Sequence, residues 1–151
     1  MDSGQGRLKL SEIKMEYYAK IENEDNGYIV TFPQFENIAT WGETLEDALK
    51  NATEALNGCV ESDFERGFVI AEPKEFKGSN YYRIPIYAHV KIALTLRKLR
   101  QTQTQLELAR KLGISYQAYQ RLENPRRCNP TIKTLEKIAK VLKKELEITI
   151  R

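Results

Sequence analysis

The stretch covering residues 104–124 constrains the fold most, because it is patterned as two short helices joined by a tight turn. Thr104 is suited to begin the first helix, since its hydroxyl can accept a hydrogen bond from an unpaired N–H of the first turn. Gly113 is suited to end it, because glycine readily adopts the left-handed conformation of a helix C-terminus. Ser115 can then begin the second helix. Apolar residues recur at helical spacing in both segments: Leu106, Leu108, Ala109 and Leu112, then Ala118, Tyr119 and Leu122. The pattern predicts a helix-turn-helix.

The sequence of this stretch resembles the Cro/repressor type of helix-turn-helix, whose motif is T-Q-x-x-L-A-x-x-L-G-[VI]-S followed later by E-N. The matching residues are Thr104, Gln105, Leu108, Ala109, Leu112, Gly113, Ile114, Ser115, Glu123 and Asn124. The alternative is an ordinary helical hairpin that makes no contact with DNA. The number of matches in order favours the DNA-binding interpretation.

The resemblance implies that the second helix lies in the major groove of double-stranded DNA and reads bases with its exposed side chains. Glutamine can bond bidentately to adenine, and arginine to guanine or a phosphate. The family pattern assigns most base reading to residues 115–117 and 121, and a phosphate contact to residue 105. The basic loop that follows is expected to add contacts to the DNA backbone. The candidate DNA-binding residues are Gln105, Ser115, Tyr116, Gln117, Gln120, Arg121, Arg126 and Arg127. For each of them, the alternative is a solvated surface side chain.

The two halves of the chain carry opposite charge. Residues 1–90 contain sixteen acidic and nine basic side chains, a net charge of −7, whereas residues 91–151 contain fifteen basic and five acidic ones, a net charge of +10. A basic half suits a polyanion such as DNA, and an acidic half attracts a basic protein. Solvation alone accounts for the acidic half, but not for a basic half that also carries a helix-turn-helix.

The composition of the sequence indicates where the protein is located and which ligands it lacks signals for. Cys59 and Cys128 are the only cysteines, and they form neither a metal-binding pattern nor a disulfide framework. We expect a reducing, cytoplasmic location. The beginning of the sequence has no apolar core of signal-peptide length, and no run approaches a membrane span, so no membrane association is expected. The sequence indicates no metal and no cofactor.

Residues 1–14 are expected to be a flexible lead-in, followed by a first module over residues 15–86. Alternating apolar residues predict strands at 15–21, 28–32 and 38–41. Thr44 begins a long helix, whose apolar stripe continues until Gly67 ends it. A polar connection at 71–80 leads to a strand at 81–86. Pro85 places that strand at a sheet edge, since proline cannot donate a ladder hydrogen bond. The predicted order is β-β-β-α-β.

The sequence of this module resembles the antitoxin family HicB, whose typical motif is G-Y-x-V-x-F-P followed by T-x-G-x-T-x-E-E-A. The matches lie at residues 27–33 and 40–48. The family fold is a degraded ribonuclease-H-like sheet, which implies an α+β class. The family binds HicA, a small basic ribonuclease toxin that cleaves messenger RNA, and some members carry a helix-turn-helix behind the sheet module.

Residues 87–151 are expected to form an all-α DNA-binding and dimerisation domain with a C-terminal strand. A helix over 87–101 should point Val90, Ala93, Leu94, Leu96 and Leu99 inward, and Lys91, Arg97, Lys98 and Arg100 outward. A helix beginning at Thr131 should bury Ile132, Leu135, Ile138, Ala139 and Leu142. Residues 145–150 alternate at the period of a strand that has no partner in its own module, so we expect it to pair with a symmetry mate. The predicted dimerisation residues are Leu146, Ile148 and Ile150.

The first module is predicted to be non-catalytic. A working ribonuclease H needs several clustered carboxylates, and the early strands offer only Glu16; the single histidine, His89, lies near a module boundary. The aromatic residues Phe32, Phe35 and Trp41 are weak candidates for toxin contacts, with a place in the core as the alternative.

Together, these patterns predict an antitoxin that is a homodimer or higher oligomer, caps a HicA-like toxin, and represses its own palindromic operator. One alternative is a repressor that senses a small ligand and has no toxin partner. Another is a nuclease that kept activity in the sheet, and the residues argue against it.

Overall fold

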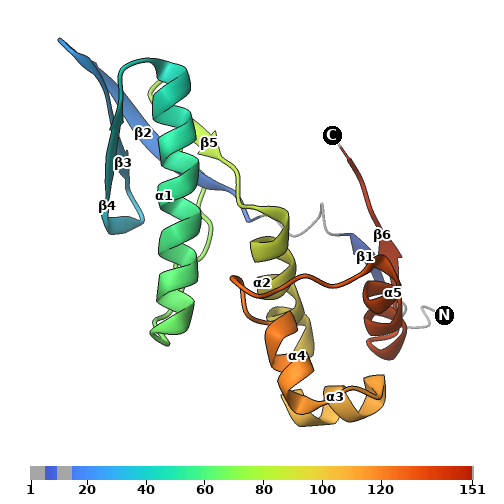
Figure 1. The fold of residues 1–151 in the computed structure, drawn as a ribbon. Coiled ribbons are helices and arrows are strands. Elements are labelled where there is room, and N and C mark those ends of the chain that lie inside the picture. The colour runs from blue at the N-terminus through green and yellow to red at the C-terminus, as the bar shows by residue number, and fades with distance from the viewer. Residues whose placement is uncertain (1–5, 10–14, 151) are drawn as a thin grey trace. The chain divides into compact units, whose positions relative to one another are not determined.

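The computed structural model describes residues 6–9 and 15–150, and its class is α+β. The described chain divides into two units. The N-terminal module is Met15–Tyr87. The C-terminal module is residues 88–150 together with the short strand β1 (Gly6–Lys9). In Figure 1 the N-terminal module runs from blue to lime, and the C-terminal module runs from lime to red with the blue strand β1 added to it. No helix within the described ranges is long and apolar enough to cross a membrane.

The N-terminal module is built on a four-stranded antiparallel sheet in the order β4-β3-β2-β5. The strands are β2 (Tyr17–Glu24), β3 (Gly27–Phe32), β4 (Phe35–Gly42) and β5 (Tyr81–Ile84). All four were predicted, although β2 and β4 are longer than expected because their polar ends still pair. The edge position of β5 is confirmed, in keeping with the proline that follows it.

Helix α1 (Leu45–Glu65) covers one face of this sheet (Figure 1). It begins as predicted, since the Thr44 side chain accepts a hydrogen bond of 3.1 Å from the Asp47 N–H. Its buried side chains pack against the inward residues of the strands. This core consists of Ala48, Ala52, Leu56 and Val60 from the helix, with Tyr17, Ala19, Ile21, Val30, Phe32 and Ile84 from the sheet. The predicted 3.6-residue stripe is therefore the face that holds the module together.

The glycine of the T-x-G-x-T pattern has a steric cause. A Cβ on Gly42 would lie 2.2 Å from the backbone nitrogen of Ala48, so only glycine lets β4 run this close to the start of α1. Gly27 is similarly restricted, because its φ is +153° and a Cβ would lie 2.6 Å from the carbonyl oxygen of Gly42. These two glycines fix the corner where β3, β4 and α1 meet.

One buried side chain on α1 was not predicted. Asn57 is 1% exposed, and its amide nitrogen donates to the carbonyl oxygen of Pro85 at 3.1 Å. Its side-chain oxygen accepts from the Tyr87 N–H at 2.8 Å. The stripe of apolar residues did not reveal this position, because an asparagine is read as polar. Asn57 ties α1 to the segment that leaves the module after β5.

The C-terminal module contains the predicted helices α2 (Ala88–Arg100), α3 (Gln105–Leu112), α4 (Tyr116–Leu122) and α5 (Ile132–Val141). Thr104, Ser115 and Thr131 are the N-caps, as expected. The core of this module is formed by Leu96, Leu108, Ala109, Tyr119, Leu122, Leu135 and Ile138. Two residues of the apolar helix patterns are exposed: Leu106 by 43% and Ile132, which was expected to be buried, by 61%. Each lies in the first turn of its helix, on the side away from this cluster.

The C-terminal strand has a partner within its own chain. Strand β6 (Lys144–Glu147) pairs in parallel with β1, so that Leu146 lies opposite Leu8. The expectation that it needs a symmetry mate was wrong, because residues 6–9 of the predicted lead-in supply the partner strand. A four-residue strand is too short for its pattern to stand out in sequence. Residues 1–5, 10–14 and 151 lie outside the described ranges.

This pairing corrects one predicted dimerisation residue. Leu146 is partly buried and packs against the core of its own module, because alternation along β6 turns it inward and leaves Glu145 and Glu147 exposed. Ile148 and Ile150 follow the end of β6 and are 48% and 94% exposed. Only these two of the three residues are free to contact another molecule.

Candidate nucleic-acid interface

Capping residues define the ends of α3 and α4 and the turn between them. The Thr104 hydroxyl accepts from the Glu107 N–H at 3.1 Å, and the Glu107 carboxylate accepts from the Thr104 N–H at 2.9 Å, which completes a capping box. Gly113 adopts the left-handed conformation with φ of 69°. The Ser115 hydroxyl accepts from the Ala118 N–H at 3.1 Å. These caps fix the direction in which α4 leaves the turn.

A buried ion pair fixes the far end of α4. The Nε of Arg100 donates to the carboxylate of Glu123 at 2.8 Å, and the Glu123 side chain is only 1% exposed. Arg100 also donates to the carbonyl oxygen of Gln103 at 2.8 Å. The prediction that Arg100 faces outward was wrong, because a buried carboxylate needs a cationic partner. Burial raises the pKa of Tyr119, and the neighbouring Glu123 carboxylate raises it further.

The outer face of α4 carries the predicted base-reading residues. Tyr116, Gln117, Gln120 and Arg121 are all exposed. The side chains of Gln117, Gln120 and Arg121 make no hydrogen bond to any other residue of the described ranges. Their amide and guanidinium groups are therefore available for base edges or phosphates.

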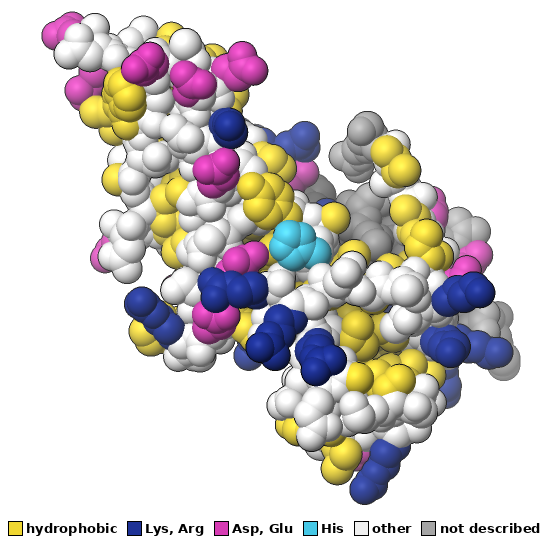
Figure 2. Space-filling view, in the orientation of Figure 1, with side chains coloured by type: hydrophobic (Ala, Val, Ile, Leu, Met, Phe, Trp, Pro, Cys, Tyr) yellow, Lys and Arg dark blue, Asp and Glu magenta, His cyan; other side chains and the backbone are white. Residues whose placement is uncertain are grey.

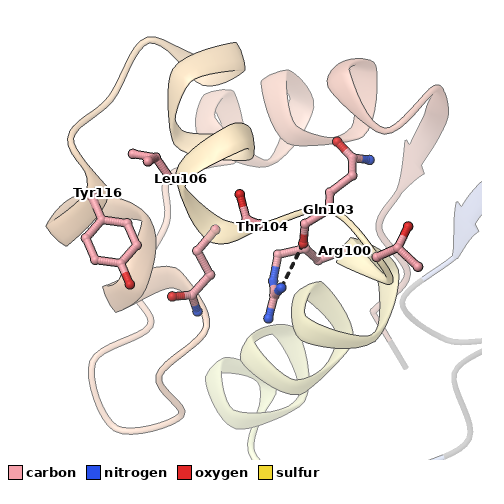
Figure 3. A pocket seen from close by; sticks show the side chains of 7 residues that line it. Arg100, Gln103, Thr104, Leu106 and Tyr116 are labelled. Atoms are coloured by element: carbon pink, nitrogen blue, oxygen red, sulfur yellow. Dashed lines mark hydrogen bonds between the residues drawn. The ribbon is translucent and has the colours of Figure 1, made fainter.

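Beside this face lies a hollow of about 530 Å³ (Figure 3). Leu106 of α3 and Tyr116 at the start of α4 line one side of it, and Arg100 lies in the same lining with its guanidinium bonded to the Gln103 carbonyl oxygen. Gln105, the predicted phosphate contact, lies in the same lining. The full lining is Arg100, Thr102, Gln103, Thr104, Gln105, Leu106 and Tyr116.

The remaining predicted residues have different surroundings. Ser115 acts as the N-cap of α4, so its hydroxyl oxygen is already an acceptor. Arg126 and Arg127 lie with exposed side chains on the loop between α4 and α5, where the Arg126 N–H donates to the Asn124 side chain at 3.0 Å. The structure thus groups Gln105 with Tyr116 and places the two arginines on a separate loop.

Sequence reasoning missed two residues of this region. Leu106 occupies a variable position of the T-Q-x-x-L-A pattern, which was a signal that it does not belong to the core. No local signal pointed to Arg100, because its partner Glu123 lies 23 positions further along the chain. Both residues line the hollow.

The toxin-contact candidates of the N-terminal module separate clearly. Phe32 and Phe35 are 4% and 7% exposed, and their ring centroids lie 6.2 Å apart in the core. They are not surface contacts, because they fill the space under α1. Trp41 is 45% exposed. Within the described residues, no group of three or more His, Cys, Asp or Glu side chains could hold a metal ion.

Comparison with known proteins agrees with both modules. Residues 16–93 match the model of the HicB-like antitoxin of bacterial toxin–antitoxin systems, and residues 96–148 match a helix-turn-helix model. Antitoxin HicB 1 of Photorhabdus laumondii is 32% identical over 127 residues, 84% of this chain and 81% of the relative. Antitoxin HicB of Escherichia coli K12 is 30% identical over 83% of this chain and 91% of its own.

A solved structure, the Burkholderia pseudomallei antitoxin HicB, is 27% identical with a TM-score of 0.43, over 49% of this chain and 64% of that one. The named relatives are antitoxins. On the family match to the N-terminal module and the length of the relatives' alignments, this chain belongs to the HicB-like antitoxin family and carries a C-terminal helix-turn-helix domain.

Proposed function

We propose that this chain neutralises a HicA-like, small, basic ribonuclease by covering its active site, and that it represses its own operon. In this proposal residues 15–86 bind the toxin, and residues 87–151 dimerise and bind a palindromic operator. The observation that supports it most is the joining of a HicB-like module to a helix-turn-helix in halves of charge −7 and +10. Inhibition is steric, and this chain performs no chemistry.

The first test is to express this chain together with the small open reading frame beside its gene. We expect a basic partner to co-purify in fixed stoichiometry, to be toxic alone, and to lose its RNA cleavage in the complex. A promoter fragment of the same operon should bind the chain in a mobility-shift assay. A chain that binds the promoter but no neighbouring protein would leave a ligand-sensing repressor as the better reading.

The DNA contacts can be separated into base and backbone contacts. Gln117→Ala should weaken operator binding by ~1–3 kcal/mol and relax specificity at one base pair, because it removes a side chain that faces the groove. Arg127→Ala should weaken all sequences alike and lower the slope of log K against log salt by about 1, since it removes one phosphate contact. Equal behaviour of the two variants would contradict the assignment.

Dimerisation is assigned to the residues after β6. Ile148 and Ile150 are exposed, and burying them between two copies would remove apolar surface from water. A twofold dimer places two recognition helices roughly 34 Å apart, one turn of DNA. Ile148→Asp/Ile150→Asp should shift the chain to monomer in light scattering. Lys133→Asp/Lys137→Asp, on exposed positions of α5, is the matched control for the change in charge. A double isoleucine variant that stays dimeric would reject this interface.

A further inference from the structure

The face of the N-terminal sheet opposite α1 exposes a tryptophan. Trp41 on β4 lies across from Ile29 of β3, and Ile29 lies across from Glu22 of β2. Side chains alternate along a strand, so these three point away from the core face that contains Val30 and Ile21. Exposed tryptophans are uncommon on free surfaces and common at the centre of protein interfaces.

The indole is held in place from below. A Cβ on Gly27 would lie 2.8 Å from two atoms of the Trp41 ring, so the ring rests directly on the backbone of that glycine. The Asn51 side chain donates to the Trp41 carbonyl oxygen at 2.8 Å, which anchors the backbone to α1. A side chain that is already ordered loses less conformational entropy when a partner binds.

Carboxylates share a hollow with this ring. The hollow measures about 590 Å³ and is lined by Asn23, Glu24, Asp25, Asn26, Gly27 and Trp41. Glu24 and Asp25 are exposed and make no ion pair with any residue of the described ranges. The nearby Lys20 is engaged at 3.0 Å by Glu22. An aromatic face beside two carboxylates without cationic partners is the arrangement that favours a guanidinium or ammonium group.

The charge around the hollow has the same sign. Residues 15–87 carry fourteen acidic and six basic side chains, a net charge of −8. Figure 2 shows acidic side chains gathered at the end of the N-terminal module where Figure 1 places the β2–β3 hairpin and the start of α1. Such a surface accelerates the approach of a basic protein and repels DNA.

We propose that Trp41, Glu24 and Asp25 form a cation socket, which receives a lysine or arginine side chain of the basic toxin. This rests on the proposed function, because the toxin is the occupant. The cation stacks on the indole and pairs with the carboxylates, and Ile29 extends the apolar contact along the sheet face. The socket places the toxin on the open face of the sheet.

The test measures the affinity of the purified full-length chain for the co-encoded toxin, using inactive toxin in a surface-binding assay. Trp41→Ala should weaken binding by about 30-fold or more, the scale of an interface hot spot. Glu24→Gln/Asp25→Asn should slow association by on the order of tenfold at low salt, with a smaller effect at high salt. Phe68→Ala and Glu54→Gln/Glu75→Gln, which change exposed residues elsewhere in the module, should bind within about twofold of the wild type.

A direct readout comes from fluorotryptophan, because Trp41 is the only tryptophan and gives one fluorine resonance. That resonance should shift when toxin is added and stay unchanged with operator DNA. If the toxin binds the wild type and the socket variants equally, the socket is overturned while the proposed function stands. If the wild type binds no toxin, both the cation socket and the proposed function are rejected. Should Trp41→Ala lose its cooperative unfolding transition, Glu24→Gln/Asp25→Asn decides, since it alters only exposed side chains of the hairpin.

Discussion

The two modules each bury a polar side chain that ties a helix to the segment next to it, but they use different chemistry. In the N-terminal module the neutral amide of Asn57 bonds to the backbone at Pro85 and Tyr87. In the C-terminal module the charged Arg100 bonds to Glu123 and to the Gln103 carbonyl. Replacing the neutral Asn57 side chain removes one or two hydrogen bonds to the backbone. Replacing Arg100 leaves the buried carboxylate of Glu123 without its cationic partner.

The difference also separates the two surfaces. The C-terminal module keeps its buried carboxylate neutralised and exposes amides and cations on α4. The N-terminal module leaves Glu24 and Asp25 without ion pairs among the described residues and exposes Trp41 beside them. In the proposed function, the first of these surfaces meets a polyanion and the second meets a cationic protein. The single tryptophan and the buried Cys128 allow each module to be followed separately.

Breaking the Arg100–Glu123 ion pair should have the largest effect on folding stability. Arg100→Met should destabilise the C-terminal module by ~3–5 kcal/mol, because Glu123 stays buried without its partner. The rate of Cys128 alkylation in urea measures the opening of that module, and Trp41 fluorescence in the same samples should not move. Arg100→Met/Glu123→Leu should recover much of the loss. A single variant as stable as the wild type would show that the pair contributes little.

The glycine corner of the N-terminal module offers a second comparison. Gly42→Ala should destabilise this module by ~2–3 kcal/mol, because its Cβ would overlap the backbone of Ala48. Gly58→Ala on α1 is the matched control: its Cβ meets nothing within 4 Å, and alanine favours the helix by about 0.5–1 kcal/mol. The urea midpoint from Trp41 fluorescence should therefore fall for one variant and rise for the other. A rise for both would remove the steric explanation of the T-x-G-x-T pattern.

Cutting the neutral tie should have a smaller effect. Asn57→Ala should destabilise the N-terminal module by ~1–3 kcal/mol, since it leaves the Pro85 carbonyl and the Tyr87 N–H without their partner. Asn51→Ala, on the same helix, removes one exposed hydrogen bond to Trp41 and should change stability by under about 1 kcal/mol. Trp41 fluorescence in urea measures both. Equal losses would mean that burial of the amide does not matter.

The smallest expected effect is the loss of folding stability at high pH, which should begin at different pH values in the two modules. Burial raises the pKa of the Cys128 thiol to about 11 from its ordinary value of 9.0. As the pH rises, the thiol therefore ionises in the unfolded chain before it ionises in the folded chain. The free energy of unfolding falls for this reason between about pH 9 and about pH 11. Cys128→Ala should lose about 1–2 kcal/mol less than the wild type over that range, by urea unfolding followed with circular dichroism. In the N-terminal module, burial raises the pKa of Tyr17 to about 12, so its decline should begin later. Parallel pH profiles for variant and wild type would contradict the assignment to Cys128.

Most of the fold could be predicted from sequence, because the helices carry caps and regular apolar spacing. Thr44, Thr104, Ser115 and Thr131 all begin helices as expected. The failures involve contacts between residues far apart in the chain. Nothing local to Arg100 shows that it meets Glu123, and nothing local to residues 6–9 shows that they pair with β6. Periodicity identifies which face of an element is apolar, but not which polar residue on that face has a buried partner.

The candidate DNA-binding residues followed from the family pattern, and the structure exposes Gln117, Gln120 and Arg121 as expected. The exposed aromatic residue of the sheet could not be separated from the buried ones by sequence, since Phe32, Phe35 and Trp41 all lie in or beside strands. Only the register shows that Trp41 turns to the open face.

The pairing of β1 with β6 sets an order of events during translation. Strand β1 leaves the ribosome before the N-terminal module, yet β6 emerges only after every helix has been made. The N-terminal module is contiguous over residues 15–87, so it can complete its sheet and capture a partner while the rest of the chain is still being synthesised. The C-terminal module can therefore complete its pair of strands only after β6 has been made. In the proposed function, a new chain can thus bind its toxin before it can bind its operator.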